Sequence, residues 1–193
     1  MPRTALVVVA VLLLVGFGAA QSSDRIEVFG GYSYTRPDFS LVSPNDANGW
    51  NASADFKARR WIGFVADLSG FYPSYAYPEG SSVSGKTYTF LFGPQFTLPL
   101  GRFEPFGRFL IGFSHVSAQN FGGYTENFFQ SNNAFTLGTG GGLDYRVARH
   151  IAIRGQVDWL YALFTPTGGG DPGVNYVRNR NVARISTGVV FRF

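Results

Sequence analysis

Apolar and polar residues alternate along most of this chain, and this period of two constrains the fold more than any other feature. From Ile26 to Thr35, apolar or aromatic side chains occupy every second position, and mostly small or polar residues lie between them. The pattern returns in 50–57, 62–72, 88–96, 108–113, 135–146, 151–163 and 184–193. Successive side chains of a β-strand point to opposite faces, so such alternation is typical of strands with one apolar face. The sequence therefore predicts a series of eight strands.

The segments that connect these strands alternate between long and short. The long ones, rich in Gly, Ser, Asn and Pro, are 37–47, 73–85, 117–133 and 165–180, and the short ones are 59–61, 99–104 and 148–150. Short turns at one end and long loops at the other are typical of outer-membrane barrels. We therefore expect an all-β fold, an eight-stranded antiparallel up-and-down transmembrane β-barrel, with both termini in the periplasm. Pro94 lacks an N–H for the strand ladder and predicts a local bulge.

The first twenty residues read as a secretory signal peptide. Arg3 precedes an apolar stretch from Ala5 to Gly18, and small residues follow up to a cleavage point before Gln21. We expect 1–20 to be the signal peptide and 21–193 to be the barrel domain, located in the outer membrane of a diderm bacterium. An uncleaved anchor helix is the alternative, although the stretch is shorter than the roughly 20 residues that a spanning helix needs.

The polar face of the predicted strands combines glycine and serine with charged residues, which suits a tight barrel lumen. Small residues leave room there for long arginine side chains. The expected lumen charge network consists of Glu27, Asp55, Lys57, Asp67, Arg108, Asp144, Arg146, Arg154, Asp158, Arg184 and Arg192. Acidic and basic members nearly balance, as a buried network requires, because an unpaired buried charge is expensive. We expect this network to fill the interior, which leaves a narrow porin-like channel as the alternative.

The apolar face is expected to meet lipid. Its aromatic residues gather toward both ends of the strands, as the aromatic girdles of membrane barrels do. Shifting the alternation by one residue would turn the arginines toward lipid, where each costs about 2–4 kcal/mol at the midplane. A soluble ligand-binding barrel, whose apolar face points inward, remains the alternative.

Composition excludes several classes of function. The formal net charge is +4, and the basic residues are spread along the chain, so no nucleic-acid partner is expected. The chain has no cysteine and only two histidines, His115 and His150, which lie far apart. We therefore expect no disulfide, no metal site and no cofactor.

The last strand carries a resemblance to a known family. Its sequence, 184–193, alternates apolar residues and closes on Phe191 and Phe193. This resembles the terminal strand of outer-membrane proteins, and 137–161 resembles the penultimate hairpin of small outer-membrane protein A-like and X-like barrel domains. The resemblance implies that Phe191 and Phe193 form the signal read by the barrel-assembly machinery. It also implies periplasmic chaperones as partners during assembly.

One pair of residues suggests catalysis. His115 and Ser117 share the parity of the apolar face and would face outward near the extracellular rim. A His-x-Ser pair in this position is similar to the site of outer-membrane lipid A deacylases, where His is the general base for a Ser nucleophile. Glu126 could supply the acid that orients His115. In that family Asn follows the Ser, whereas this chain has Ala118.

Taken together, these features favour a monomeric, non-enzymatic membrane barrel. It would scaffold the outer membrane, contact lipid or lipopolysaccharide, and present its long loops to partners. A lipid-A-modifying hydrolase at the rim, built on His115 and Ser117, is the alternative function.

Overall fold

The computed structural model describes residues 25–37, 47–76, 82–121, 129–164 and 180–193. They form antiparallel strands whose bounds are β1 Ile26–Pro37, β2 Ala47–Arg59, β3 Ile62–Phe71, β4 Ser74–Ala76, β5 Ser82–Thr97, β6 Phe103–Phe121, β7 Phe129–Ala148, β8 Ile151–Phe164 and β9 Arg180–Arg192. The predicted signal peptide lies outside these residues. Among the residues described, no helix has the length and apolar character to cross a membrane.

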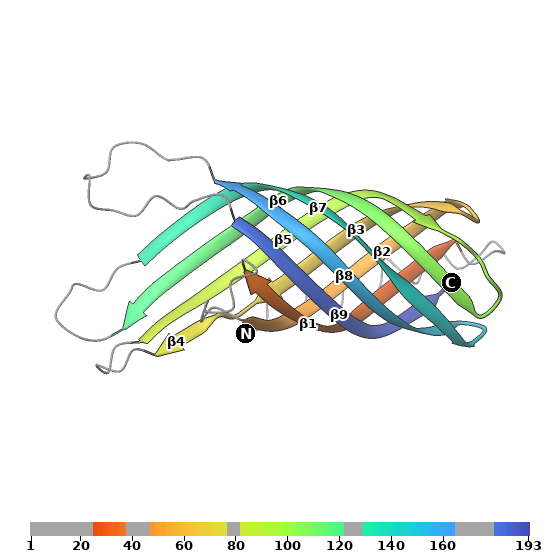
Figure 1. Ribbon diagram of the computed structural model, residues 1–193, viewed down its shortest axis with the longest axis horizontal. Coiled ribbons are helices and arrows are strands. Elements are labelled where there is room, and N and C mark those ends of the chain that lie inside the picture. Colours follow the sequence, from red (N-terminus) through yellow and green to blue (C-terminus); the bar gives the residue numbers. More distant parts are fainter. Residues whose placement is uncertain (1–24, 38–46, 77–81, 122–128, 165–179) are drawn as a thin grey trace.

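The strands close into a barrel (Figure 1). Strands that follow one another in the sequence pair with each other, except that β3 and β4 both pair with β5, and β1 pairs with β9 to close the barrel. β3 and β4 are two parts of one wall strand, interrupted at Tyr72 and Pro73. The expected eight-stranded antiparallel up-and-down barrel is thus confirmed.

Both ends of the barrel sequence meet at one end of the molecule. Ile26 and Phe193 exchange backbone hydrogen bonds of 3.2 and 2.9 Å. The short turns lie at this same end, which we name the turn end (Figure 1). In the β5–β6 turn, Gly101 has a φ of 69°, a conformation that glycine adopts without steric cost.

Several strands are longer than the sequence indicates. β6 continues to Phe121 and β7 begins at Phe129, so much of the expected 117–133 loop is strand. Likewise, β4 pairs with the start of β5 inside the expected 73–85 loop. The sequence does not predict these extensions, because the alternation of apolar residues stops before the backbone hydrogen bonds of the hairpin do.

The expected bulge at Pro94 is wrong. Phe92 pairs with Ile111 and Gln95 with Arg108, so the β5–β6 register is the same on both sides of the proline. Only the pairs of Gly93 and Pro94 with β6 are missing, while both residues still pair with β3. The missing N–H therefore interrupts the ladder on one side without adding a residue.

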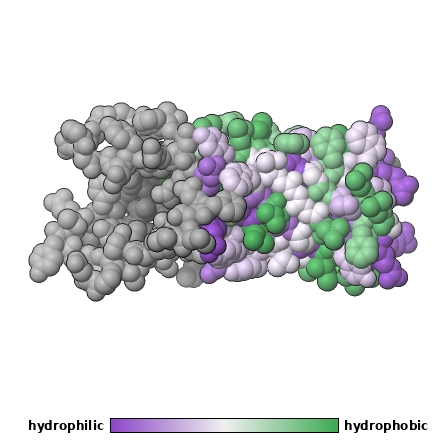
Figure 2. Space-filling view, in the orientation of Figure 1, coloured by the Kyte–Doolittle hydropathy of each residue, from purple (hydrophilic) through white to green (hydrophobic). Residues whose placement is uncertain are grey.

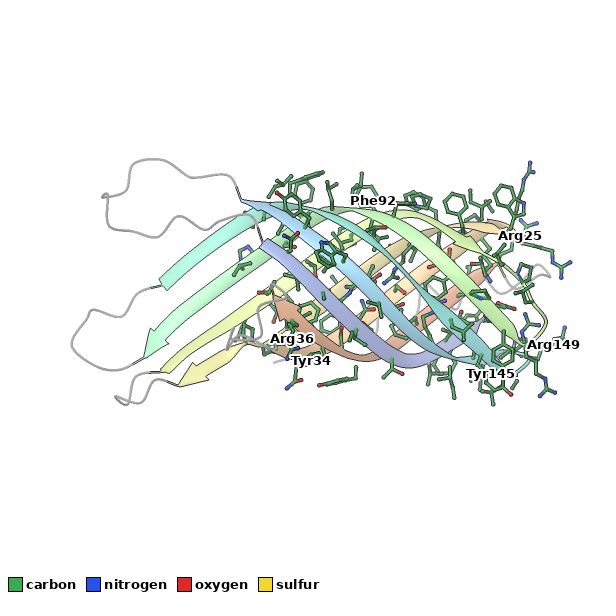
Figure 3. All side chains as sticks on the ribbon, viewed as in Figure 1. Arg25, Tyr34, Arg36, Phe92, Tyr145 and Arg149 are labelled. Atoms are coloured by element: carbon green, nitrogen blue, oxygen red, sulfur yellow. The ribbon has the colours of Figure 1, made fainter. Side chains whose placement is uncertain are left out.

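The outer wall is apolar and the lumen is polar. Large hydrophobic residues such as Phe109, Phe113 and Val157 are 55–62% exposed on the outside. Phe92 projects away from the wall, and Tyr145 lies at the turn end with Arg149 (Figure 3). Hydrophobic patches cover the wall up to a hydrophilic turn end (Figure 2). This arrangement is the inverse of a soluble protein, and it has the parity that the sequence predicts.

Candidate functional site

Four charged residues meet across the middle of the lumen, and we name them the central quartet: Asp67, Arg108, Asp158 and Arg184. Arg108 donates from Nε and Nη2 to the two carboxylate oxygens of Asp158 at 2.8 and 2.7 Å. Arg184 contacts both acids, with Nη1 to Asp67 Oδ1 at 2.8 Å and Nη2 to Asp158 Oδ2 at 2.9 Å. All four side chains have 0% exposure, so this charge is compensated entirely within the protein.

A second group of charges, the turn-side cluster, fills the lumen nearer the turn end. Its members are Glu27, Lys57, Glu104, Asp144, Arg146, Arg154 and Arg192. Arg154 donates from Nε and Nη2 to Asp144 at 2.7 and 2.8 Å, and Arg192 donates to Glu104 at 2.7 Å. The Arg154 guanidinium also lies 4.5 Å from the ring centroid of Phe106, which packs it against an inward aromatic face.

Amide side chains extend the lumen interactions beyond the charges. Asn51 donates to Asp67 at 3.0 Å and accepts from Gln156 at 2.8 Å. Gln95 donates to the buried Asp55 at 2.7 Å. The Asn51–Gln156 and Gln95–Asp55 contacts join strands that are not neighbours in the wall, and so they tie separate parts of the barrel together across the lumen.

Two charged residues, Glu104 and Arg146, lie in other surroundings than the sequence predicts. Glu104, expected in a turn, lies in β6 and is 2% exposed. The predicted network has five acids and six bases, and Glu104 adds a sixth acid, so the numbers of acidic and basic side chains become equal. Arg146 lies where the lumen opens at the turn end, and its side chain is 43% exposed and contacts Glu104. Within the described part of the chain, no group of three or more His, Cys, Asp or Glu is arranged to hold a metal ion.

Glycine in β7 allows the central quartet to pack, and this gives a first prediction. A Cβ at Gly140 would overlap Asp158 Oδ1 and would lie 2.5 Å from the carbonyl oxygen of Val157. Gly140→Ala should therefore displace Asp158 from Arg108 and lower the free energy of unfolding by about 1–3 kcal/mol. Gly155→Ala is the control, because no atom lies within 4 Å of its Cβ position. Urea unfolding in lipid vesicles measures both, and equal stability of the two variants would contradict the packing argument.

A separate polar group, the rim triad, lies on the outer wall: His115, Ser117 and Asn133. His115 and Ser117 project from the same face of β6, and Asn133 lies directly opposite His115 on β7. Ser117 Oγ lies 3.3 Å from His115 Nε2, and His115 Nδ1 lies 2.7 Å from Asn133 Oδ1. The structure thus connects His115 to Ser117, while Glu126 lies outside the described residues.

The sequence pattern does not indicate Asn133 as a partner of His115, because 117–133 resembles a loop and Glu126 is the acidic candidate there. Once β6 and β7 are known to continue as a hairpin, their register places Asn133 beside His115. A neutral amide oxygen can accept the same Nδ1–H hydrogen bond that a carboxylate accepts.

Comparisons with known proteins support the fold. Neisserial surface protein A matches with a TM-score of 0.63 and 17% identity, over 90% of this chain and 100% of that chain. Ail, the attachment invasion locus protein of Yersinia pestis, matches at 0.58 and 15%, over 87% and 96%. A major outer membrane protein from Thermus thermophilus matches at 0.57 and 13%, over 86% and 99%. No protein-family model and no curated protein sequence matches the chain. At these identities the likeness concerns the fold, and the chain has the fold of small outer-membrane barrels.

Proposed function

We propose that this protein is an integral outer-membrane barrel that acts as a monomeric structural anchor with a filled lumen, and that its loop segments contact partners. The observation that carries the proposal is the inverted polarity of the barrel. Arg108 and Arg184 are 1% and 0% exposed, whereas Phe109 is 62% exposed. Only a lipid environment makes such an outer surface favourable, because exposed apolar area in water opposes folding.

The contents of the lumen favour anchoring over conduction. An eight-stranded barrel encloses a space that side chains can just fill. Here the central quartet and the turn-side cluster occupy it, and Val65, Leu91, Leu110 and Leu160 form an apolar group beside them. An ion crossing the lumen would have to separate paired buried charges, which costs several kcal/mol per charge.

The turn end gives the proposed orientation. Exposed arginines surround it, including Arg59, Arg60, Arg102 and Arg149. Basic side chains are attracted to the headgroups of anionic phospholipids. Short turns face the periplasm in outer-membrane barrels, so we place the turn end, with both termini, in the periplasm, and the loop end against lipopolysaccharide. Assembly would involve periplasmic chaperones and the barrel-assembly machinery, with Phe191 and Phe193 as its signal.

Two measurements on the purified chain test this proposal together. Unboiled protein in detergent should migrate differently from boiled protein on a gel, since a closed barrel resists unfolding by the detergent alone. The same folded protein should give no steady conductance in planar bilayers. Identical migration and solubility without detergent would contradict the membrane barrel, and a stable single-channel current would favour a narrow channel instead.

A further inference from the structure

We propose that exposed arginines around the turn end form a binding surface that selects anionic phospholipids from the periplasmic leaflet. We name this surface the arginine collar, and its members are Arg25, Arg59, Arg60, Arg102 and Arg149. The inference deepens the proposed function and rests on it, because it assigns the class of lipid that surrounds one end of the membrane anchor. The ligand is the phosphate group of a lipid with a net negative charge, such as phosphatidylglycerol.

The collar arginines come from all three short turns at this end of the barrel. Arg59 and Arg60 lie where β2 turns into β3. Arg102 lies between β5 and β6, and Arg149 lies between β7 and β8, while Arg25 directly precedes β1. Figure 3 shows Arg25 and Arg149 at separate places around this end, which is also the hydrophilic end of the surface in Figure 2. The positive charge is therefore spread around the barrel, where several surrounding lipids can meet it.

The acidic side chains near this end point into the lumen and leave the outside positive. Glu27, Glu104 and Asp144 are each 2% exposed, and they contact lumen arginines such as Arg154 and Arg192. Across the five described ranges of the chain, every acidic side chain is buried, so the exposed charged side chains there are all basic. The turn end thus presents net positive charge to its surroundings.

Apolar residues in the same turns set the depth of the collar in the membrane. Trp61, directly after Arg60, is 50% exposed. Arg102 lies between Leu100 and Phe103, which are 64% and 53% exposed. Exposed aromatic residues at the end of a membrane barrel mark the boundary between the hydrocarbon core and the headgroups. Guanidinium groups one or two residues away therefore lie at the level of the lipid phosphates, which favours a lipid over a cell-wall polymer as the ligand.

Arginine is the side chain best suited to a phosphate group. Its guanidinium offers N–H donors in a planar fork that fits two phosphate oxygens at once. The ammonium group of a zwitterionic lipid offsets the charge of its phosphate, whereas phosphatidylglycerol keeps a net negative charge. Each basic side chain near an anionic membrane surface is worth a factor of about five in affinity. The collar should therefore enrich anionic lipid from a mixed bilayer.

Trp61 allows the lipids beside the collar to be measured directly. The chain has three tryptophans, and Trp50 and Trp159 lie toward the loop end, in the halves of β2 and β8 away from the short turns. Replacing both by Phe leaves Trp61 as the single fluorescent reporter. The folded barrel is placed in vesicles of phosphatidylcholine and phosphatidylglycerol, and one of the two lipids carries bromine atoms that quench a nearby tryptophan.

We expect phosphatidylglycerol to occupy the positions beside Trp61 at least about fivefold more strongly than phosphatidylcholine. The preference should fall as salt is added, because salt screens interactions between exposed charges. Arg59→Gln combined with Arg60→Gln removes two charges beside the reporter and should bring the ratio close to one. The matched control is Arg36→Gln combined with Lys86→Gln, which removes two exposed charges toward the loop end and should leave the ratio unchanged.

Equal quenching by the two lipids in the unsubstituted collar would overturn the inference, as would a preference that persists without Arg59 and Arg60. Binding to isolated peptidoglycan that needs the same two arginines, with no lipid preference, would assign the collar to the cell wall instead. Failure of the membrane placement gives a different result, because a barrel outside the bilayer would be quenched by neither brominated lipid. Heat-modifiable migration, recorded for every variant, shows that each sample is folded.

Discussion

Asp158→Ala is expected to lower the free energy of unfolding of the barrel by about 3–5 kcal/mol, because it removes one partner from a buried set of ion pairs. Arg108 and Arg184 both contact Asp158, at 2.7 and 2.9 Å. Without it, two buried guanidinium groups share Asp67 alone. Urea unfolding in lipid vesicles, followed by tryptophan fluorescence and by gel migration, measures the loss.

A double variant distinguishes lost pairing from lost packing. Asp158→Leu combined with Arg108→Leu removes one acid and one base, and it leaves Arg184 paired with Asp67 at 2.8 Å. Replacing a buried ion pair by apolar residues is often neutral, so the double variant should be more stable than Asp158→Ala. Arg149→Ala, at the exposed turn end, should leave the unfolding midpoint unchanged. A double variant less stable than the single one would show that pairing does not account for the effect.

The sequence predicts the wall of this barrel better than its interior. Strict alternation assigns each residue to one face, so the buried state of Arg154 and Asp158 follows from the sequence alone. The partners inside the lumen do not follow. Arg184 and Asp67 are 117 positions apart and lie on strands that are not neighbours. Their contact depends on strand tilt and side-chain length, which periodicity does not determine.

The sequence pattern does not indicate the roles of Glu104 and Asn133, for a related reason. Glu104 lies near Pro99 and Pro105, and prolines suggest a turn, although Pro105 fits on the outward face of β6. Asn133 lies in a polar segment that resembles a loop, although it pairs with His115 across a hairpin. In both cases the backbone ladder continues where the apolar pattern is weak. The lumen network and the rim triad are completed by residues in these weakly patterned segments.

Val157→Arg should destabilise the barrel by about 2–4 kcal/mol in a bilayer, the cost of an arginine at the midplane of a barrel wall. Val157 lies midway along β8 between Ile151 and Tyr161, and its side chain is 55% exposed. A guanidinium at this depth lies far from either headgroup layer, so it must draw water or headgroups into the hydrocarbon core. Reversible unfolding from vesicles of dilauroylphosphatidylcholine provides the measurement.

Leu100→Arg is the matched control, because it makes a comparable exchange at the turn end. Leu100 is 64% exposed in the β5–β6 turn, where an arginine reaches water and should cost about 0–1 kcal/mol. The comparison distinguishes an outer wall that faces lipid from an outer wall that faces water. If the outer wall faced water, a charge at an exposed valine would be tolerated as well as one at Leu100. Equal stability of the two variants would therefore remove the membrane assignment.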